Sequence, residues 1–313
     1  MAESIWKDYE VSFGSVAETD YTIEAAGVAI FSGHAVRRPG QAQLTVRIND
    51  VCADYLLHAL PSLSSAGAVT DTSTVTFTVK DGGGSTVDTV AFAPDWSYDY
   101  DHTDGAVSDP VNARVSEQQA IVLTKGSGNT AFTLRYEGGA SETVTVSSSG
   151  GATQVVTLPL SSYTGLKSVT AAGITYDVVP ACHRYALLYV NAYGGWDTLL
   201  CEGRSSEVDA YDRHTMRQRY DNAVRSARGT SEYVNEVARR WTLRTGWLKD
   251  VEAARMHHVL GSAHVWLYDI FEGALLPVII TDDNCEYKTY RGNGAQPVNY
   301  TLTVELAQEM TRR

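Results

Sequence analysis

The chain has 313 residues, of which 43% are hydrophobic and 20% are charged, and its formal net charge is −12. This composition excludes a disordered chain, and the length predicts two or three domains of about 100 to 200 residues. Residues 1–180 hold 9 Lys and Arg against 20 Asp and Glu, a balance of −11, whereas residues 181–313 hold 16 against 17, a balance of −1. Because phosphate repels an acidic chain, we expect no nucleic-acid partner.

The N-terminal residues, the lengths of the apolar runs and the spacing of the cysteines limit the classes of protein to which the chain can belong. The first residues, MAESIWKDYEVSF, lack a basic segment followed by an apolar run, so we expect no cleaved secretion signal. No stretch approaches the ~18 consecutive apolar residues of a membrane span, so no membrane partner is expected. The four cysteines have no C-x-x-C spacing, which argues against a zinc ribbon, and we interpret them as reduced, small hydrophobic side chains. They are Cys52, Cys182, Cys201 and Cys285.

Residues 1–110 are predicted to form an N-terminal β domain. Up to residue 60 the pattern indicates short strands with a turn at Arg38-Pro39-Gly40, because apolar and polar residues alternate from residue 44 to 48. Residues 61–70 resemble a Ser-, Ala- and Gly-rich loop. Two β-rich runs between residues 72 and 96 then form a hairpin that turns at Asp81-Gly-Gly-Gly84.

A long acidic loop, DWSYDYDHTDGAVSD, is predicted for residues 95–109. Asp99, Asp101 and Asp104 alternate as in part of a calcium loop, although the terminal glutamate of such a loop is missing, so solvated carboxylates are the alternative. Three aromatic residues of the same loop are candidates for contact with a glycan, or else they dock on protein. They are Trp96, Tyr98 and Tyr100.

The rest of the chain is predicted to form two further β modules. Residues 111–180 contain about five short strands bounded by Gly, Ser or Asn, at the spacing of a small β-sandwich. Residues 181–313 form a C-terminal β domain, which opens with an apolar hairpin turning at Gly194-Gly195. Two long polar strands follow, then one helix at about residues 247–260 and further strands.

The helix contains two adjacent histidines, His257 and His258. A zinc helix needs ligands one turn apart, as in H-E-x-x-H, whereas neighbouring residues diverge by about 100° around a helix. We therefore predict that this helix begins near Thr245 or Gly246 and packs on a sheet. A metal site is the weaker alternative.

Arginines of the two long polar strands are the candidate interface. Between residues 201 and 260, nine acidic residues fall among eleven basic ones, which favours either salt-bridged strands or contact with an acidic partner surface. The acidic first half of a second copy is such a surface. The candidate interface residues are Arg213, Arg217, Arg219, Arg239, Arg240 and Arg244.

Motifs for catalysis or cofactor binding are absent from the sequence. There is no G-x-S-x-G, no phosphate-binding lysine loop and no dinucleotide fingerprint. We expect no enzyme activity and no cofactor. A carbohydrate-binding or adhesin module that uses the acidic loop is the alternative function, and a hydrolase that uses its aspartates is a further one.

The segments VAIFSGHAVRRPGQAQLTVRINDVCADYL, YALLYVNAYGGWDTLL, TGWLKDVEAARMHHVLGSAHVWLYD and NYTLTVELAQEMTRR resemble tail structural proteins of phages and prophages of Bacteroides-type bacteria. The order of elements in the second half is also similar to that of distal-tail and tail-tube proteins. The resemblance implies a ring of identical subunits at the tail tip or baseplate, contacting tube, hub and receptor-binding proteins. It also implies a protein made in the host cytoplasm and located in the virion.

Overall fold

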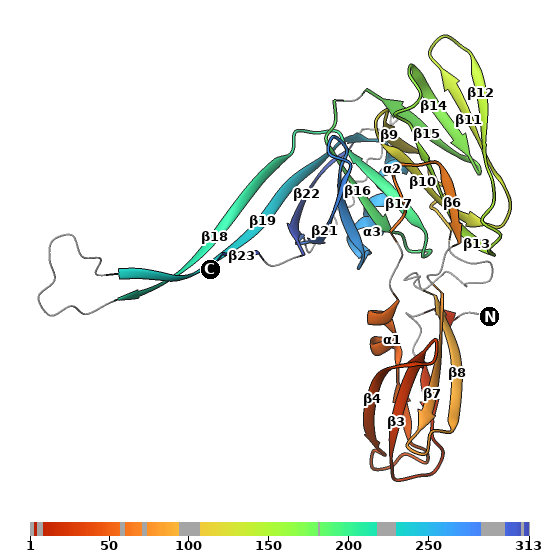
Figure 1. The fold of residues 1–313 in the computed structure, drawn as a ribbon, viewed down its shortest axis with the longest axis vertical. Helices are drawn as coiled ribbons and strands as arrows, with labels where there is room; N and C mark the ends of the chain where they lie inside the picture. Colours follow the sequence, from red (N-terminus) through yellow and green to blue (C-terminus); the bar gives the residue numbers. More distant parts are fainter. Residues whose placement is uncertain are drawn as a thin grey trace, which may run out of the picture. The chain divides into compact units, whose positions relative to one another are not determined.

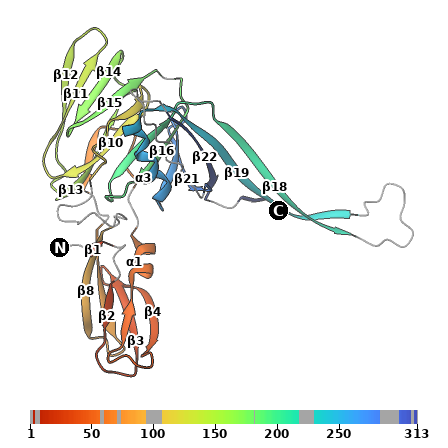
Figure 2. The same ribbon diagram turned by 180° about the vertical axis from the view of Figure 1, so that it is seen from behind.

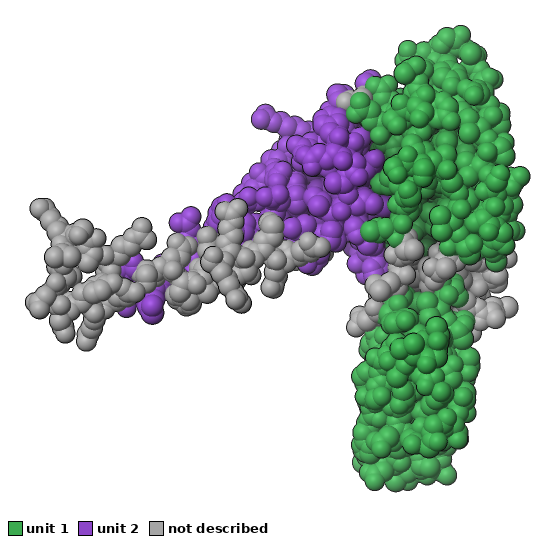
Figure 3. Space-filling model, in the orientation of Figure 1, with its two compact units in different colours: residues 1–179, 189–198 green, residues 180–188, 199–313 purple. Residues whose placement is uncertain are grey.

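The computed structural model describes residues 3–4, 9–56, 60–70, 74–93, 107–180, 182–217, 230–282, 298–307 and 310–312. The described residues form 23 strands and three short helices, so the predicted mainly β fold is confirmed. The chain forms two compact units, which Figure 3 colours separately. Unit 1 contains residues 1–179 and 189–198, and unit 2 contains residues 180–188 and 199–313.

The N-terminal part of unit 1 contains a five-stranded sheet in the order β1-β8-β7-β3-β4 (Figures 1 and 2). Strands β2 and β5 form a separate pair. The predicted hairpin is confirmed, because β7 and β8 pair antiparallel on either side of the 81–84 turn. The elements are β1 (Glu3–Ser4), β2 (Glu10–Ser12), β3 (Glu18–Ala25), β4 (Val28–Val36), β5 (Thr45–Arg47), α1 (Asn49–Tyr55), β7 (Val75–Asp81) and β8 (Thr86–Ala93).

Helix α1 corrects the prediction of strands throughout residues 9–60. Ile48, Cys52 and Leu56 recur every four residues, and each is at most 2% exposed. That spacing places them on one side of a helix, where they join the core formed by the five-stranded sheet. Burial raises the pKa of the Cys52 thiol to about 12, so this cysteine has the predicted character of a small hydrophobic side chain.

The other face of the five-stranded sheet is polar. Lys80 pairs with Glu24 across the sheet, with 2.7 Å between Nζ and Oε2. His34 on β4 lies 2.7 Å from the Asp20 carboxylate on β3, and this hydrogen bond raises the pKa of the imidazole above its ordinary value. One face of the sheet therefore covers the core while the other carries cross-strand polar pairs.

A β-sandwich forms the second part of unit 1. A three-stranded sheet, β10-β13-β6, and a five-stranded sheet, β12-β11-β14-β15-β9, enclose one core. Phe132, Leu134, Leu158, Leu160 and Val169 are fully buried in this core. The strands are β6 (Gly67–Thr70), β9 (Ala113–Ser116), β10 (Ala120–Gly126), β11 (Thr130–Tyr136), β12 (Ser141–Val146), β13 (Thr153–Pro159), β14 (Leu166–Ala171) and β15 (Ile174–Val179).

Strand β6 corrects the prediction of a loop over residues 61–70. Gly67–Thr70 pairs antiparallel with residues 154–157 of β13. Ala68 faces the sandwich core. The pairing therefore brings a segment from the predicted N-terminal domain into the sheet of the predicted 111–180 module. The domain boundaries that we expect after residues 110 and 180 stay predictions.

The turn between β16 and β17 belongs to unit 1 and is held by the buried side chain of Asn191. Its Oδ1 accepts hydrogen bonds from the main-chain N–H groups of Tyr193 (2.9 Å) and Gly195 (3.0 Å). Its Nδ2 donates to the Val107 carbonyl (3.0 Å) and to the Asp197 carboxylate (2.6 Å). This side chain thus ties the turn to the segment that begins at residue 107.

Two further contacts close the same junction. Ser108 Oγ donates to the Trp196 carbonyl oxygen (2.7 Å), and the Trp196 N–H donates to Thr124 Oγ1 (2.8 Å). A Cβ atom at Gly195 would lie 2.2 Å from the Val107 carbonyl oxygen, so a side chain at this position requires the backbone to move. We call Asn191 and these contacts the turn clip.

Unit 2 is built on an eight-stranded sheet in the order β17-β16-β20-β21-β22-β19-β18, with β23 paired to β19. The predicted hairpin at Gly194-Gly195 is confirmed, because β16 and β17 are neighbours on either side of this turn. The elements are β16 (Tyr185–Val190), β17 (Trp196–Cys201), β18 (Ser206–Arg217), β19 (Thr230–Leu248), α2 (Asp250–Ala253), α3 (Arg255–Gly261), β20 (Val265–Asp269), β21 (Ala274–Ile280), β22 (Val298–Leu306) and β23 (Met310–Arg312).

The predicted helix over residues 247–260 is wrong in its start and its continuity. Strand β19 continues to Leu248, and two short helices follow, separated by Ala254. Thr245 lies on β19, where its hydroxyl accepts a hydrogen bond from the Tyr300 N–H (3.1 Å). The first helix begins after Lys249, whose N–H donates to the Glu252 carboxylate (2.8 Å). A β-bulge between Arg244 and Trp247, where Gly246 has a φ of 75°, shifts the register with β22 just before this point.

Candidate interaction surface

The most prominent candidate surface in unit 2 is a two-stranded arm formed by β18 and β19. Strands β19 and β22 pair only from Leu248 back to Arg240, whereas β18 and β19 stay paired to Arg217 and Thr230. Figures 1 and 2 both show the hairpin running on beyond β22. We call residues 209–217 and 230–239 the arm; of the described strands, β23 alone pairs with it besides its own two, at residues 235–237.

The arm exposes apolar as well as polar side chains. Tyr211 is 48% exposed and Met216 is 50% exposed. The guanidinium carbon of Arg213 lies 5.8 Å from the centre of the Tyr211 ring, on the same face of β18. A two-stranded ribbon is at best marginally stable alone in water, so these exposed groups are suited to contact another surface.

The predicted interface arginines do not form one patch. The register of β18 and β19 places Arg213, Arg217 and Arg239 on one face, and Arg240 and Arg244 on the other. The β-bulge opposite His214 places its extra residue on β19, so alternate residues of β18 still point to the same face. Arg213 and Arg217 therefore share one face of β18, as predicted. Arg219 lies outside the described residues.

Arg239 and Arg240 form ion pairs within their own sheet. Arg239 binds Asp209 through Nε to Oδ1 (2.8 Å) and Nη2 to Oδ2 (3.3 Å), and it lies 3.3 Å from Glu207. Arg240 Nε binds the Glu305 carboxylate (2.7 Å). The salt-bridged strands considered for this region are thus present at both positions. The interface role of all six arginines stays a prediction.

The two adjacent histidines lie in α3 and face different surroundings. His257 is exposed, whereas His258 is 9% exposed. Their ring centres are 6.1 Å apart and the ring planes differ by 71°. Among the described residues, no group of three or more His, Cys, Asp or Glu side chains is placed to hold a metal ion.

The candidates in the predicted acidic loop lie outside the described residues. This applies to the calcium candidates Asp99, Asp101 and Asp104 and to the glycan candidates Trp96, Tyr98 and Tyr100. Both interpretations stay predictions. The described chain resumes at Val107, directly at the turn clip.

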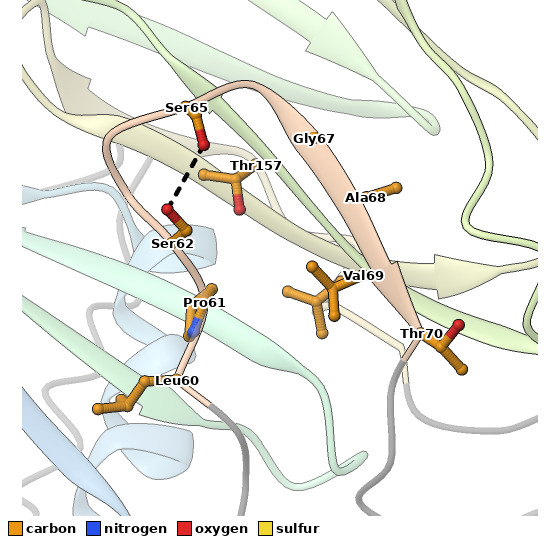
Figure 4. A pocket seen from close by; sticks show the side chains of 10 residues that line it. Leu60, Pro61, Ser62, Ser65, Gly67, Ala68, Val69, Thr70 and Thr157 are labelled. Carbon is orange, nitrogen blue, oxygen red and sulfur yellow. Dashed lines mark hydrogen bonds between the residues drawn. The ribbon is translucent and has the colours of Figure 1, made fainter.

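A small cavity lies over β6 and β13 in unit 1 (Figure 4). Its volume is ≈ 100 Å³, and its lining includes Leu60, Pro61, Val69 and Val155 but no charged side chain. The hydroxyl groups of Ser62 and Ser65 are 3.5 Å apart across the loop that bounds it (Figure 4). The cavity has far less than the several hundred Å³ of an ordinary small-molecule site.

The cysteines differ in their surroundings. Cys201 is buried, which raises the pKa of its thiol to about 12, whereas Cys182 is exposed. Cys182 is a free cysteine, and its exposure differs from that of the small hydrophobic side chain that we predicted. Cys285 lies outside the described residues.

Sequence reasoning missed the turn clip. Asn191 and Asp197 lie in an apolar run and are buried, which the local pattern of YALLYVNAYGGWDTLL does not reveal. The only sequence feature that could have indicated this turn clip is the presence of two polar residues, Asn191 and Asp197, on either side of Gly194-Gly195 in an otherwise apolar run.

No protein-family model matches the chain, and no curated protein matches it. Within the described ranges, no helix is both long enough and apolar enough to cross a membrane.

Proposed function

We propose that this chain is a structural protein of a phage virion, located at the tail tip or baseplate. It assembles there as a ring of identical subunits and connects the tail tube to hub or receptor-binding proteins. The arm is the observation that carries the proposal, and the sequence resemblance supports it. In this account the protein performs no chemistry, and its mechanism is assembly.

The arm provides the contact between neighbouring subunits. Burying the exposed halves of Tyr211 and Met216 against a neighbour contributes roughly 1 kcal/mol for each side chain. Arg213 and Arg217, which lie on the Tyr211 face of β18 and opposite to Met216, add attraction to an acidic surface. The first 180 residues, with a charge balance of −11, supply such a surface in every copy. Head-to-tail contacts of this kind form a ring when the rotation from one subunit to the next closes on itself.

Substitution of an exposed apolar residue on the arm tests this role. Met216→Lys removes apolar contact area and adds a charge within the proposed interface. Phe271→Lys is the matched control, because Phe271 is 55% exposed in the turn between β20 and β21, away from the arm strands. Mass photometry and negative-stain electron microscopy of the full chain, alone and with co-expressed tail proteins, measure ring formation.

We expect rings with the unchanged chain and with Phe271→Lys, and mainly monomers with Met216→Lys. Rings that form equally well with Met216→Lys would show that the arm is not the contact. A chain that stays monomeric under every condition, including with its tail proteins, would contradict the proposed function itself.

A further inference from the structure

The open edges of the sheets differ in how well they resist pairing with another chain. Natural edge strands are kept from pairing by being short, by charged residues or by a covering segment. In the described part of the chain, β6 and β9 have four residues each, and five of the twelve residues of β18 are charged. The edge of β10 is covered, because the Ser108 N–H donates to the Thr124 carbonyl (2.9 Å).

Strand β4 lacks these protections. It is the last strand of the five-stranded sheet, nine residues long, with the sequence VAIFSGHAV. His34 is its only ionisable side chain, and the strand contains no lysine and no proline. Val28 is 64% exposed, Phe31 37% and Val36 62%. Of the described strands, only β3 pairs with it.

The available part of this edge is regular from Phe31 to Val36. The bulge in β4 lies at Ile30, between the pairs Ile23–Phe31 and Glu24–Ala29, and beyond it the register with β3 is continuous. In an antiparallel ladder alternate residues direct their N–H and C=O groups to the same side, so half of these groups point away from β3. A row of outward-pointing main-chain N–H and C=O groups is complementary to the same row on another extended strand, so the expected partner at this edge is a strand.

Charge indicates which strand fits. Arg37 and Arg38 follow β4 directly, whereas Ala29 and Ile30 at the other end of the strand are uncharged. When two copies of β4 pair antiparallel over Phe31–Val36, Arg37 and Arg38 of each copy lie opposite Ile30 and Ala29 of the other, so the two pairs of arginines stand at opposite ends of the joined sheet. A parallel pair would bring four arginines together at one end. The uncharged centre of the strand brings no like charges into contact.

We propose that two copies of this chain pair through β4, edge to edge and antiparallel over Phe31–Val36, so that two five-stranded sheets become one continuous sheet. This contact is separate from the arm and does not rest on the proposed tail function. It gives each copy a second surface for association, with a twofold axis in place of the head-to-tail relation of a ring.

Hydrogen exchange with mass spectrometry tests the pairing on the full chain. The unchanged chain is labelled at several concentrations, and sedimentation velocity is measured on the same samples. Ser32→Lys places a charge within the paired edge, opposite Ala35 of the second copy. Thr76→Lys is the matched control, because Thr76 is an exposed threonine on β7, a strand inside the same sheet. Circular dichroism confirms that both variants keep the fold.

We expect exchange in residues 31–36 to slow as concentration rises, together with a dimer in sedimentation. Ser32→Lys weakens the dimer about tenfold, and Thr76→Lys leaves it unchanged. Concentration-independent exchange in β4 overturns the proposal, as does an equal effect of the two lysines. Protection of β4 that is lost with Met216→Lys but kept with Ser32→Lys also overturns it, because the occupant is then the arm.

Discussion

Asn191→Ala removes the side chain that holds the turn clip. The side chain is fully buried and makes four hydrogen bonds: two from main-chain N–H groups, one to a carbonyl and one to the Asp197 carboxylate. A typical neutral hydrogen bond contributes about 1 kcal/mol, and one to a charged group about 1.5 to 3 kcal/mol. The substitution therefore lowers the free energy of unfolding of unit 1 by roughly 4 to 6 kcal/mol.

Such a loss is a large part of the 5 to about 15 kcal/mol that stabilises an ordinary domain. Urea unfolding followed by far-UV circular dichroism measures it, and hydrogen exchange in residues 189–198 locates it. Asn129→Ala is the control, because Asn129 accepts one exposed hydrogen bond, from the Ser148 N–H (2.9 Å), and its loss costs below about 1 kcal/mol. An Asn191→Ala protein no less stable than the Asn129→Ala protein would refute the reasoning.

Three further outcomes follow from individual positions. Gly195→Ala destabilises unit 1 at least as much as Asn191→Ala, because its Cβ would lie 2.2 Å from a carbonyl oxygen; an unchanged melting temperature would contradict this. The NMR titration midpoint of His34 lies above 6.5, since its carboxylate partner raises the pKa. Its stabilising contribution is therefore complete below pH 6.5 and is lost as pH rises through the raised pKa; a midpoint at or below 6.5 would be the contrary result. In a Cys285→Ser background, a thiol reagent modifies the exposed Cys182 quickly in the native protein, whereas Cys201, with a pKa of about 12, reacts only after unfolding; rapid modification of both would show that Cys201 is accessible.

Local patterns in the sequence predict the elements that depend on neighbouring residues. The hairpin at residues 81–84 follows from its glycines, and there the Asp81 carboxylate accepts hydrogen bonds from the N–H groups of Gly83 (3.0 Å) and Ser85 (2.8 Å). The long strands β18 and β19 follow from their alternation and polarity. The mainly β fold follows from the many short runs between turn residues.

Features that depend on distant pairing do not follow from local patterns. Strand β6 is short and rich in small residues, and it becomes a strand because β13 supplies a hydrogen-bonding partner more than eighty positions later. Helix α1 resembles the end of a strand until the burial of Cys52 and Leu56 reveals the helical period. The extent of the arm depends on where β22 stops pairing, at Arg240.

The candidate interaction surface likewise has features that follow from local sequence and features that depend on pairing between strands. The shared face of Arg213 and Arg217 follows from their spacing on one strand. The pairing of Arg239 with Asp209 depends on the register between β18 and β19. The spacing of residues along either strand does not determine that register. Sequence spacing therefore predicts which residues of one strand lie together, but not which of them are neutralised by the strand beside it.

The proposed location in a phage tail is tested most directly by counting copies of the chain in purified particles. Particles are released from an induced host culture, purified on a density gradient and washed with high salt. Quantitative mass spectrometry then measures this chain relative to the major tail protein. We expect a fixed, low number of copies of the chain per particle, and we expect this number to resist the wash. Absence of the chain from the particles, or its loss in salt, would contradict the proposed role as a structural ring of the tail tip or baseplate.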